Sequence, residues 1–110
     1  MGDSLGPLAL LEQRITEEPA LAVYFSSHGC QVCHALFPRI EQMLQQEYPA
    51  ISLLRLKLDE MPELGAQMGV LSVPTLIIYL DHREAYRYVR QISVDGLRQD
   101  LARPYALLFG

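Results

Sequence analysis

The only two cysteines of this 110-residue chain, Cys30 and Cys33, are separated by two residues. An apolar, strand-like run at residues 20–25 precedes them, and a segment with helical periodicity at residues 35–47 follows them. A cysteine at such a junction meets the unpaired N–H groups and the positive dipole end of the helix, which stabilise a thiolate. The spacing therefore predicts thiol–disulfide chemistry, in which Cys30 attacks and Cys33 resolves a mixed disulfide.

Other roles of the cysteine pair stay open at this point. Two inert structural thiols would have no reason to fall at a strand-to-helix junction. Zinc could use the two thiolates with His28 and His34, but the chain has no second cysteine pair and only one further histidine, His82. Residues 30–34 also match the Cys-x-x-Cys-His rule for haem attachment, which would require assembly outside the cytosol. We expect neither a metal nor another cofactor.

Two further landmarks follow the cysteines. Pro38 stands five residues after Cys33, and the run Gly-Val-Leu-Ser-Val-Pro-Thr at residues 69–75 precedes an apolar segment at residues 76–79. With the Cys-x-x-Cys motif, these features resemble the thioredoxin family over nearly the whole chain. The resemblance implies an α/β thioredoxin fold with a central mixed β-sheet flanked by helices. It also implies a cis-proline loop, at Val73-Pro74, that faces the Cys-x-x-Cys motif.

The resemblance also implies a function. It indicates a thiol–disulfide oxidoreductase that exchanges disulfides with protein substrates and depends on a separate, unidentified reductant. Cys30 and Cys33 are the expected catalytic residues. The expected substrate-binding residues are Gly29, Val73, Pro74 and Arg90.

Two histidines flank the motif and are candidates for changing the pKa of the Cys30 thiol. His28 or His34, when protonated, would lower the pKa of the Cys30 thiol and give the activity a pH dependence near neutrality. The alternative for His34 is a solvent-facing position that the family often fills with lysine.

Several positions depart from the family pattern and bear on the choice of substrate. The departures are Gly29 for an aromatic residue, Gln31-Val32 for Gly-Pro, Tyr24 for a buried acid, Arg55 for a lysine and Arg90 for a glycine on the docking surface. They favour a narrow partner range over general reductase activity. They also keep an alternative open: a thioredoxin-like interaction or assembly module whose cysteine pair is vestigial or regulatory.

Turn residues and periodicity divide the rest of the chain into alternating elements. The predicted helices cover residues 7–16, 33–48 and 62–68, with a last helix capped by Ser93 and broken by Pro104. The predicted strands cover residues 21–26, 51–58, 75–80 and 84–91, the last being a sheet-edge strand reached through a turn at residues 81–83. No repeat or linker interrupts this pattern, so we expect one domain, residues 1–110.

Composition sets the remaining expectations. Half of the residues are hydrophobic and 20% are charged, which is typical of a globular domain. The net charge of -4 argues against nucleic-acid binding and against attraction to an anionic membrane surface. No stretch approaches transmembrane length, and acidic Asp3 stands where a secretory signal would be basic. We therefore expect a cytoplasmic protein.

Overall fold

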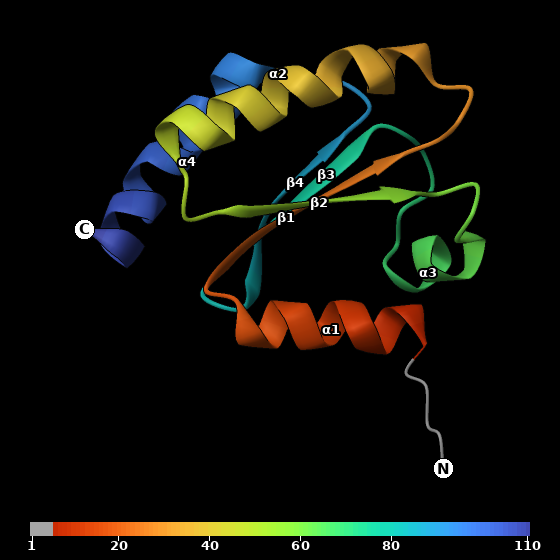
Figure 1. Ribbon diagram of the computed structural model, residues 1–110, viewed down its shortest axis with the longest axis horizontal. Coiled ribbons are helices and arrows are strands. Elements are labelled where there is room, and N and C mark those ends of the chain that lie inside the picture. The colour runs from red at the N-terminus through yellow and green to blue at the C-terminus, as the bar shows by residue number, and fades with distance from the viewer. Residues whose placement is uncertain (1–5) are drawn as a thin grey trace.

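The computed structural model of the protein describes residues 6–110, which form a four-stranded sheet with helices on both faces (Figure 1). In chain order the elements are α1 (Pro7–Glu17), β1 (Ala20–Ser26), α2 (Gln31–Glu47), β2 (Ser52–Lys57), α3 (Pro62–Gln67), β3 (Thr75–Leu80), β4 (Arg83–Val89) and α4 (Val94–Phe109). Every predicted helix and strand is present, and their ends differ from the prediction by a few residues.

The sheet has the strand order β2-β1-β3-β4. β2 runs parallel to β1, whereas β3 runs antiparallel to both β1 and β4, so the sheet is mixed, as the resemblance implied. All residues of the central strands β1 and β3 are buried, which explains their uninterrupted apolar sequences. β4 lies at an edge, as its alternating polar residues predicted.

The helices cover the sheet in two layers. α2 and α4 pack on one face, and α1 and α3 pack on the other (Figure 1). Successive side chains of a strand point to opposite faces. Accordingly, Ala22 and Tyr24 of β1 belong to the apolar cluster that includes α2 and α4, whereas Val23 and Phe25 belong to the cluster that includes α1 and α3.

One end of the sheet positions the residues singled out in the sequence. Phe25, near the end of β1, pairs with Thr75 at the start of β3, and Thr75 in turn pairs with Val89 at the end of β4. The segments that continue from these three positions carry Cys30, Pro74 and Arg90. Strand pairing therefore brings three distant parts of the chain to the same end of the sheet.

The start of α2 differs from the prediction. The helix begins at Gln31 rather than at residue 33, because Cys30 serves as its N-cap. The Cys33 N–H donates to the Cys30 sulfur at 3.1 Å, which occupies one of the free N–H groups of the first turn. Pro38 lies inside α2 without ending it.

The predicted break of the last helix at Pro104 is wrong, since α4 continues to Phe109. Proline lacks the N–H that would bond the carbonyl four residues earlier, which belongs to Asp100. The Tyr86 hydroxyl of β4 donates to this carbonyl at 3.1 Å. A side chain from the sheet thus supplies the missing hydrogen bond. Ser93 caps the helix as predicted, accepting from the Gly96 N–H at 3.0 Å.

The end of the last strand also differs from the prediction. β4 stops at Val89, and Arg90, which was expected within the strand, has a φ of 65° in the left-handed region. Its backbone N–H donates to the Pro74 carbonyl at 2.7 Å. Arg90 therefore begins the loop that leads to α4 and is tied to the proline loop through its backbone.

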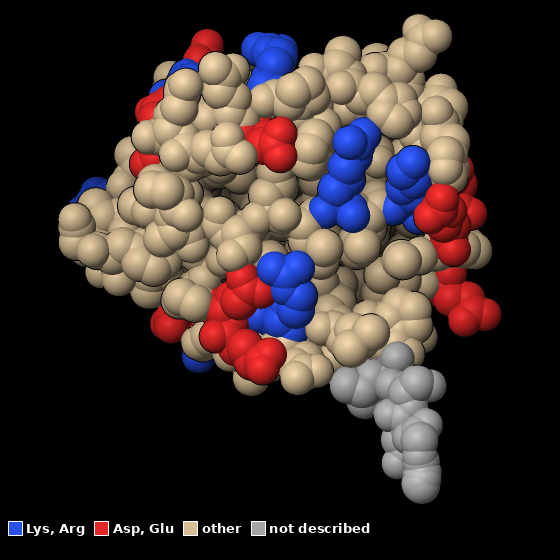
Figure 2. Space-filling view, in the orientation of Figure 1, with Lys and Arg blue, Asp and Glu red and all other residues tan. Residues whose placement is uncertain are grey.

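Several charged side chains of the surface form pairs of opposite sign. Arg14 bonds Glu18 at 2.6 Å, and Arg87 bonds Glu84 at 2.8 Å. Figure 2 shows acidic and basic side chains scattered over the face in view, some of them side by side, with uncharged surface between them. Exposed pairs of this kind contribute at most about 1 kcal/mol each to stability.

Along residues 6–110, none of the helices is both long enough and apolar enough to cross a membrane.

Candidate redox site

A disulfide joins Cys30 and Cys33, whose Cα atoms lie 5.3 Å apart. The two residues differ in their access to solvent: Cys33 is fully buried, whereas Cys30 is only half-buried. A partner molecule can therefore reach Cys30 more easily. This difference supports the predicted roles of an attacking Cys30 and a resolving Cys33.

The first turn of α2 supplies positive charge at Cys30. The helix dipole points its positive end at the N-cap, and the Cys33 N–H already donates to the Cys30 sulfur in the disulfide. When the disulfide opens, the same donor can stabilise a thiolate at this sulfur. The local backbone therefore supports the prediction that Cys30, rather than Cys33, is the attacking thiolate.

Tyr24 lies beneath the resolving cysteine. Its side chain is fully buried, and its hydroxyl donates to the Cys33 carbonyl oxygen at 2.8 Å. Burial raises the pKa of Tyr24 to about 12, although the nearby Arg55 charge opposes this shift. At neutral pH the phenol therefore keeps its proton and cannot accept one from a thiol.

His34 on the first turn of α2 connects the motif to β2. Its Nδ1 lies 2.9 Å from a guanidinium nitrogen of Arg55, and its Nε2 lies 3.1 Å from the His28 carbonyl oxygen. Arginine can only donate and a carbonyl can only accept, so these contacts fit a neutral imidazole protonated at Nε2. Arg55 also stacks over the Phe37 ring, 4.3 Å from its centroid.

His28 contacts two carboxylates that the sequence analysis missed. Its Nδ1 lies 2.7 Å from Asp59, and its Nε2 lies 3.0 Å from Glu60. The hydrogen bond from His28 holds the pKa of the Asp59 carboxyl below its usual value. Because two carboxylates offset any charge on His28, the N-terminus of α2 is the better supported source of thiolate stabilisation. That either histidine lowers the pKa of the Cys30 thiol stays a prediction.

The position of these two carboxylates follows from the topology of the sheet. Asp59 and Glu60 follow β2, which runs parallel to β1, and the ends of parallel neighbours meet at one edge of a sheet. The segment after β1 carries His28. In the part of the chain that the structure describes, no three His, Cys, Asp or Glu side chains are grouped as metal ligands.

The proline loop completes this end of the sheet. The Val73-Pro74 bond is cis, as the resemblance implied. Val73 packs against both apolar clusters, and Cys30 packs against the cluster that includes α2. The exposed Gly29 has no neighbour within 4 Å of the position that a Cβ atom would take. The surface beside Cys30 is therefore open where the family carries an aromatic side chain.

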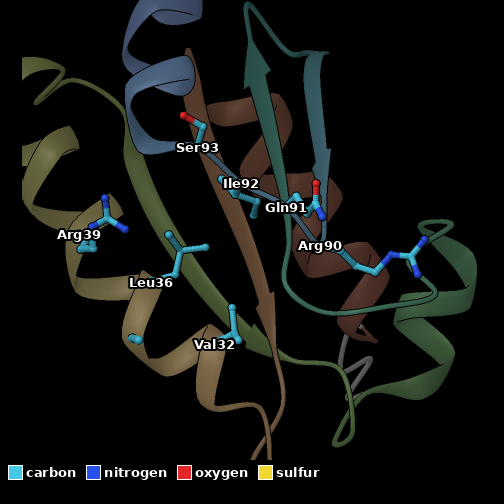
Figure 3. A pocket seen from close by; sticks show the side chains of 8 residues that line it. Val32, Leu36, Arg39, Arg90, Gln91, Ile92 and Ser93 are labelled. Carbon is cyan, nitrogen blue, oxygen red and sulfur yellow. The ribbon is translucent and has the colours of Figure 1, made fainter.

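A groove of about 710 Å³ runs between α2 and the loop from β4 to α4. Figure 3 shows Val32 and Leu36 on the α2 side and Ile92 on the loop side. Arg39 also lines the groove and was missed in the sequence analysis. The helical spacing of Val32, Leu36 and Arg39, at positions i, i+4 and i+7, would have placed them on one face of α2.

Comparison with known proteins agrees with this geometry. Residues 9–103 match the family model described as Thioredoxin. The thioredoxin-like protein YdfQ of Bacillus subtilis is 33% identical over 106 residues, which cover 96% of this chain and 94% of that protein. A thioredoxin of Chlamydia muridarum is 37% identical over 75 residues, covering 68% of this chain and 72% of its own.

Solved structures share the fold. Thioredoxin 1 of Thermosipho africanus superposes with a TM-score of 0.71 at 28% identity, over 79% of this chain and 96% of that one. Oxidised mitochondrial thioredoxin 3 of Saccharomyces cerevisiae has a TM-score of 0.77 at 19% identity, over 87% and 89% of the two chains. The family match, the shared fold and the Cys-x-x-Cys pair together show that the chain belongs to the thioredoxin family and is a thiol–disulfide oxidoreductase.

Proposed function

We propose that Cys30 and Cys33 are the catalytic pair and that the protein reduces disulfides in a restricted set of protein substrates. The Cys30 thiolate attacks one sulfur of the substrate disulfide, which forms a mixed disulfide and releases the other sulfur as a thiolate. Cys33, once deprotonated, then attacks Cys30, forms the Cys30–Cys33 disulfide and releases the second substrate thiolate. The substrate gains two electrons, and a separate thiol reductant must return the pair to its dithiol form.

The observation that carries this assignment is the asymmetry of the pair. Cys30 caps α2 and is half-buried, whereas Cys33 is fully buried within the first turn. An incoming disulfide meets Cys30 first, and the mixed disulfide is within reach of Cys33 because the two residues already bond each other. Burial keeps the resolving thiol away from other partners.

Four residues around the pair form the proposed substrate surface. An extended substrate segment would lie along the backbone at Val73 and Pro74, just before β3 begins, and would pair with it as an added strand. Gly29 leaves room beside Cys30 for this segment. Arg90, which is hydrogen-bonded to Pro74, would contact the same segment.

Two substitutions support a restricted substrate range. Tyr24 offers a phenol with a pKa of about 12 where a proton acceptor would help Cys33 to ionise. A positioned general base is typically worth about 10²–10⁴-fold in rate, so resolution should be slow. Arg90 adds a charge that a generic substrate does not match.

The same proposal includes a location in the cytoplasm, where reductants keep thiols of this kind reduced.

Insulin reduction with dithiothreitol tests this proposal. We expect turnover that depends on Cys30 and is about tenfold or more slower than that of a general thioredoxin under the same conditions. The Cys30→Ser variant provides the matched inactive control. Parity with the thioredoxin would contradict the restricted range. Turnover no greater than that of Cys30→Ser would instead favour an interaction module with a vestigial cysteine pair.

A further inference from the structure

The groove beside the disulfide has an apolar floor. Val32, Leu36 and Ile92 line it, and Val32 is 63% exposed although it lies between the two cysteines in sequence. An exposed apolar strip of this kind loses contact with water when another chain covers it, which favours binding. The groove adjoins the redox motif through Val32, which is part of the Cys-x-x-Cys sequence.

The charge of the groove is opposite to that of the whole protein. Its lining contains two arginines, Arg39 and Arg90, and no Asp or Glu, whereas the chain carries a net charge of -4. Throughout residues 6–110, neither of these arginines has a carboxylate within salt-bridge distance. By contrast, Arg98 near the same helices is paired with both Glu47 and Asp95. The groove therefore offers two cations whose charge the protein itself leaves uncompensated.

The two arginines lie on opposite sides of the apolar strip. Figure 3 shows Arg39 projecting from α2, and Arg90 extending from the loop toward α3, away from α2. The Arg90 backbone adopts the left-handed region, which costs a non-glycine residue free energy, and its N–H is bonded to Pro74. Strand β4 and the proline loop therefore fix the point from which the Arg90 side chain leaves the backbone.

We propose that this groove selects substrates in which an extended acidic segment accompanies the reacting cysteine. This inference rests on the proposed function, because the segment belongs to the protein whose disulfide Cys30 attacks. An apolar residue of the segment covers Val32 and Ile92, and carboxylates on either side of it bind Arg39 and Arg90 through charge-assisted hydrogen bonds. Complementary charge of this kind raises the association rate and rejects basic segments.

Matched peptides test the proposal. Each peptide carries one cysteine, activated as a 2-thiopyridyl disulfide, next to one leucine, and the flanking positions hold Glu, Gln or Lys. The reaction of each peptide with the reduced protein is monitored at low ionic strength by the 2-thiopyridone that it releases. This measurement gives the second-order rate constant. We expect the Glu peptide to react about tenfold faster than the Lys peptide, and the ratio to fall at 0.5 M salt, because charges at the surface are screened.

Three variants identify the residues responsible. Arg39→Ala and Arg90→Ala should each lower the Glu-to-Lys rate ratio severalfold, whereas Arg103→Ala, an exposed arginine of α4 outside the groove, should leave the ratio unchanged. A ratio near one in the unmodified protein would overturn the proposal. So would an equal loss in all three variants, because that would indicate a general effect of net charge.

A small uncharged disulfide separates this inference from the proposed function. Hydroxyethyl disulfide needs no groove, so the reduced protein should react with it whatever the groove selects. Reaction with hydroxyethyl disulfide but no preference among the peptides would overturn the acidic specificity alone. No reaction with either probe would overturn the proposed function and this inference with it.

Discussion

Tyr24 occupies the buried position beneath the resolving cysteine and affects how Cys33 can react. Its hydroxyl is bonded to the Cys33 carbonyl oxygen rather than to the sulfur. With a pKa of about 12, it remains a donor throughout the neutral range. We therefore assign Tyr24 a structural role in holding the first turn of α2, and we expect no role in proton transfer.

Replacing Tyr24 with phenylalanine tests this role. The variant leaves the ring in place and removes one buried hydrogen bond, which should lower the free energy of unfolding by about 1 kcal/mol in urea titrations. Tyr79→Phe is the control, because the structure gives the Tyr79 hydroxyl no hydrogen bond with residues 6–110. Disulfide exchange by Tyr24→Phe should stay within about twofold of the unmodified rate; a tenfold slower resolving step at unchanged stability would show that the hydroxyl takes part in the chemistry.

His28 should control the ionisation of Asp59. Removing the imidazole in His28→Ala should raise the pKa of the Asp59 carboxyl toward its ordinary value of 3.8. Because folding lowers this pKa, the stability it contributes is present above pH 3.8 and is lost as the pH falls through the lowered value. NMR titration of the carboxyl carbon measures the change. His82→Ala, at a site where the ring contacts the Ile15 carbonyl instead, should leave the Asp59 titration unaltered.

At the scale of elements, the local sequence pattern was enough to predict a strand where burial alone determines its composition. The central strands β1 and β3 are buried on both faces, and their uninterrupted apolar sequences indicated this directly. The course of α4 could not be predicted in this way, because Tyr86, which satisfies the carbonyl freed by Pro104, belongs to another element. Contacts between distant parts of the chain leave no periodic signal in the sequence.

In the candidate site, too, some residues could be predicted from local sequence and others could not. The cysteine pair and the proline loop were identified from motifs of a few consecutive residues. Asp59 and Arg39 were missed because their relation to the motif depends on how β2 pairs with β1 and on how α2 faces the loop before α4. These placements require the topology of the fold, which the motifs do not encode.

A double-mutant cycle tests how α4 tolerates its proline. Tyr86→Phe should cost about 0.5–1 kcal/mol of unfolding free energy, because the Asp100 carbonyl then loses its partner. In a Pro104→Ala background the backbone N–H restored at this position would bond that carbonyl, so the same substitution should cost much less. The measurement is urea unfolding of the four proteins. Equal costs in both backgrounds would mean that the hydroxyl does not compensate for the proline.

At the scale of the whole molecule, the buried tyrosines link stability to alkaline pH. Tyr24 and Tyr79 belong to the two apolar clusters on opposite faces of the sheet, and burial raises the pKa of each to about 12. The unfolded chain loses these protons near pH 10, so stability is fully present below pH 10 and is lost as the pH rises toward 12.

Urea unfolding of the oxidised protein between pH 9 and 11 measures this loss. Each of the two tyrosines should lower the free energy of unfolding by roughly 1 kcal/mol at pH 11, because the unfolded chain has lost the phenol proton at this pH whereas the folded protein still holds most of it. The Tyr24→Phe variant should lose correspondingly less stability over this range. A free energy of unfolding that does not change between pH 9 and 11 would mean that these phenols ionise in the folded protein as they do in the unfolded chain.

The measurement that most directly tests the whole account is the trapping of a mixed disulfide with single-cysteine variants. Cys33→Ser, incubated with a peptide disulfide, should accumulate a covalent adduct on Cys30, because the serine cannot release it. Cys30→Ser should form much less adduct, because its remaining thiol is buried. Intact-protein mass spectrometry followed by peptide mapping identifies the site. Adduct formation mainly on Cys33, or none on either variant, would contradict the assignment of Cys30 as the attacking residue.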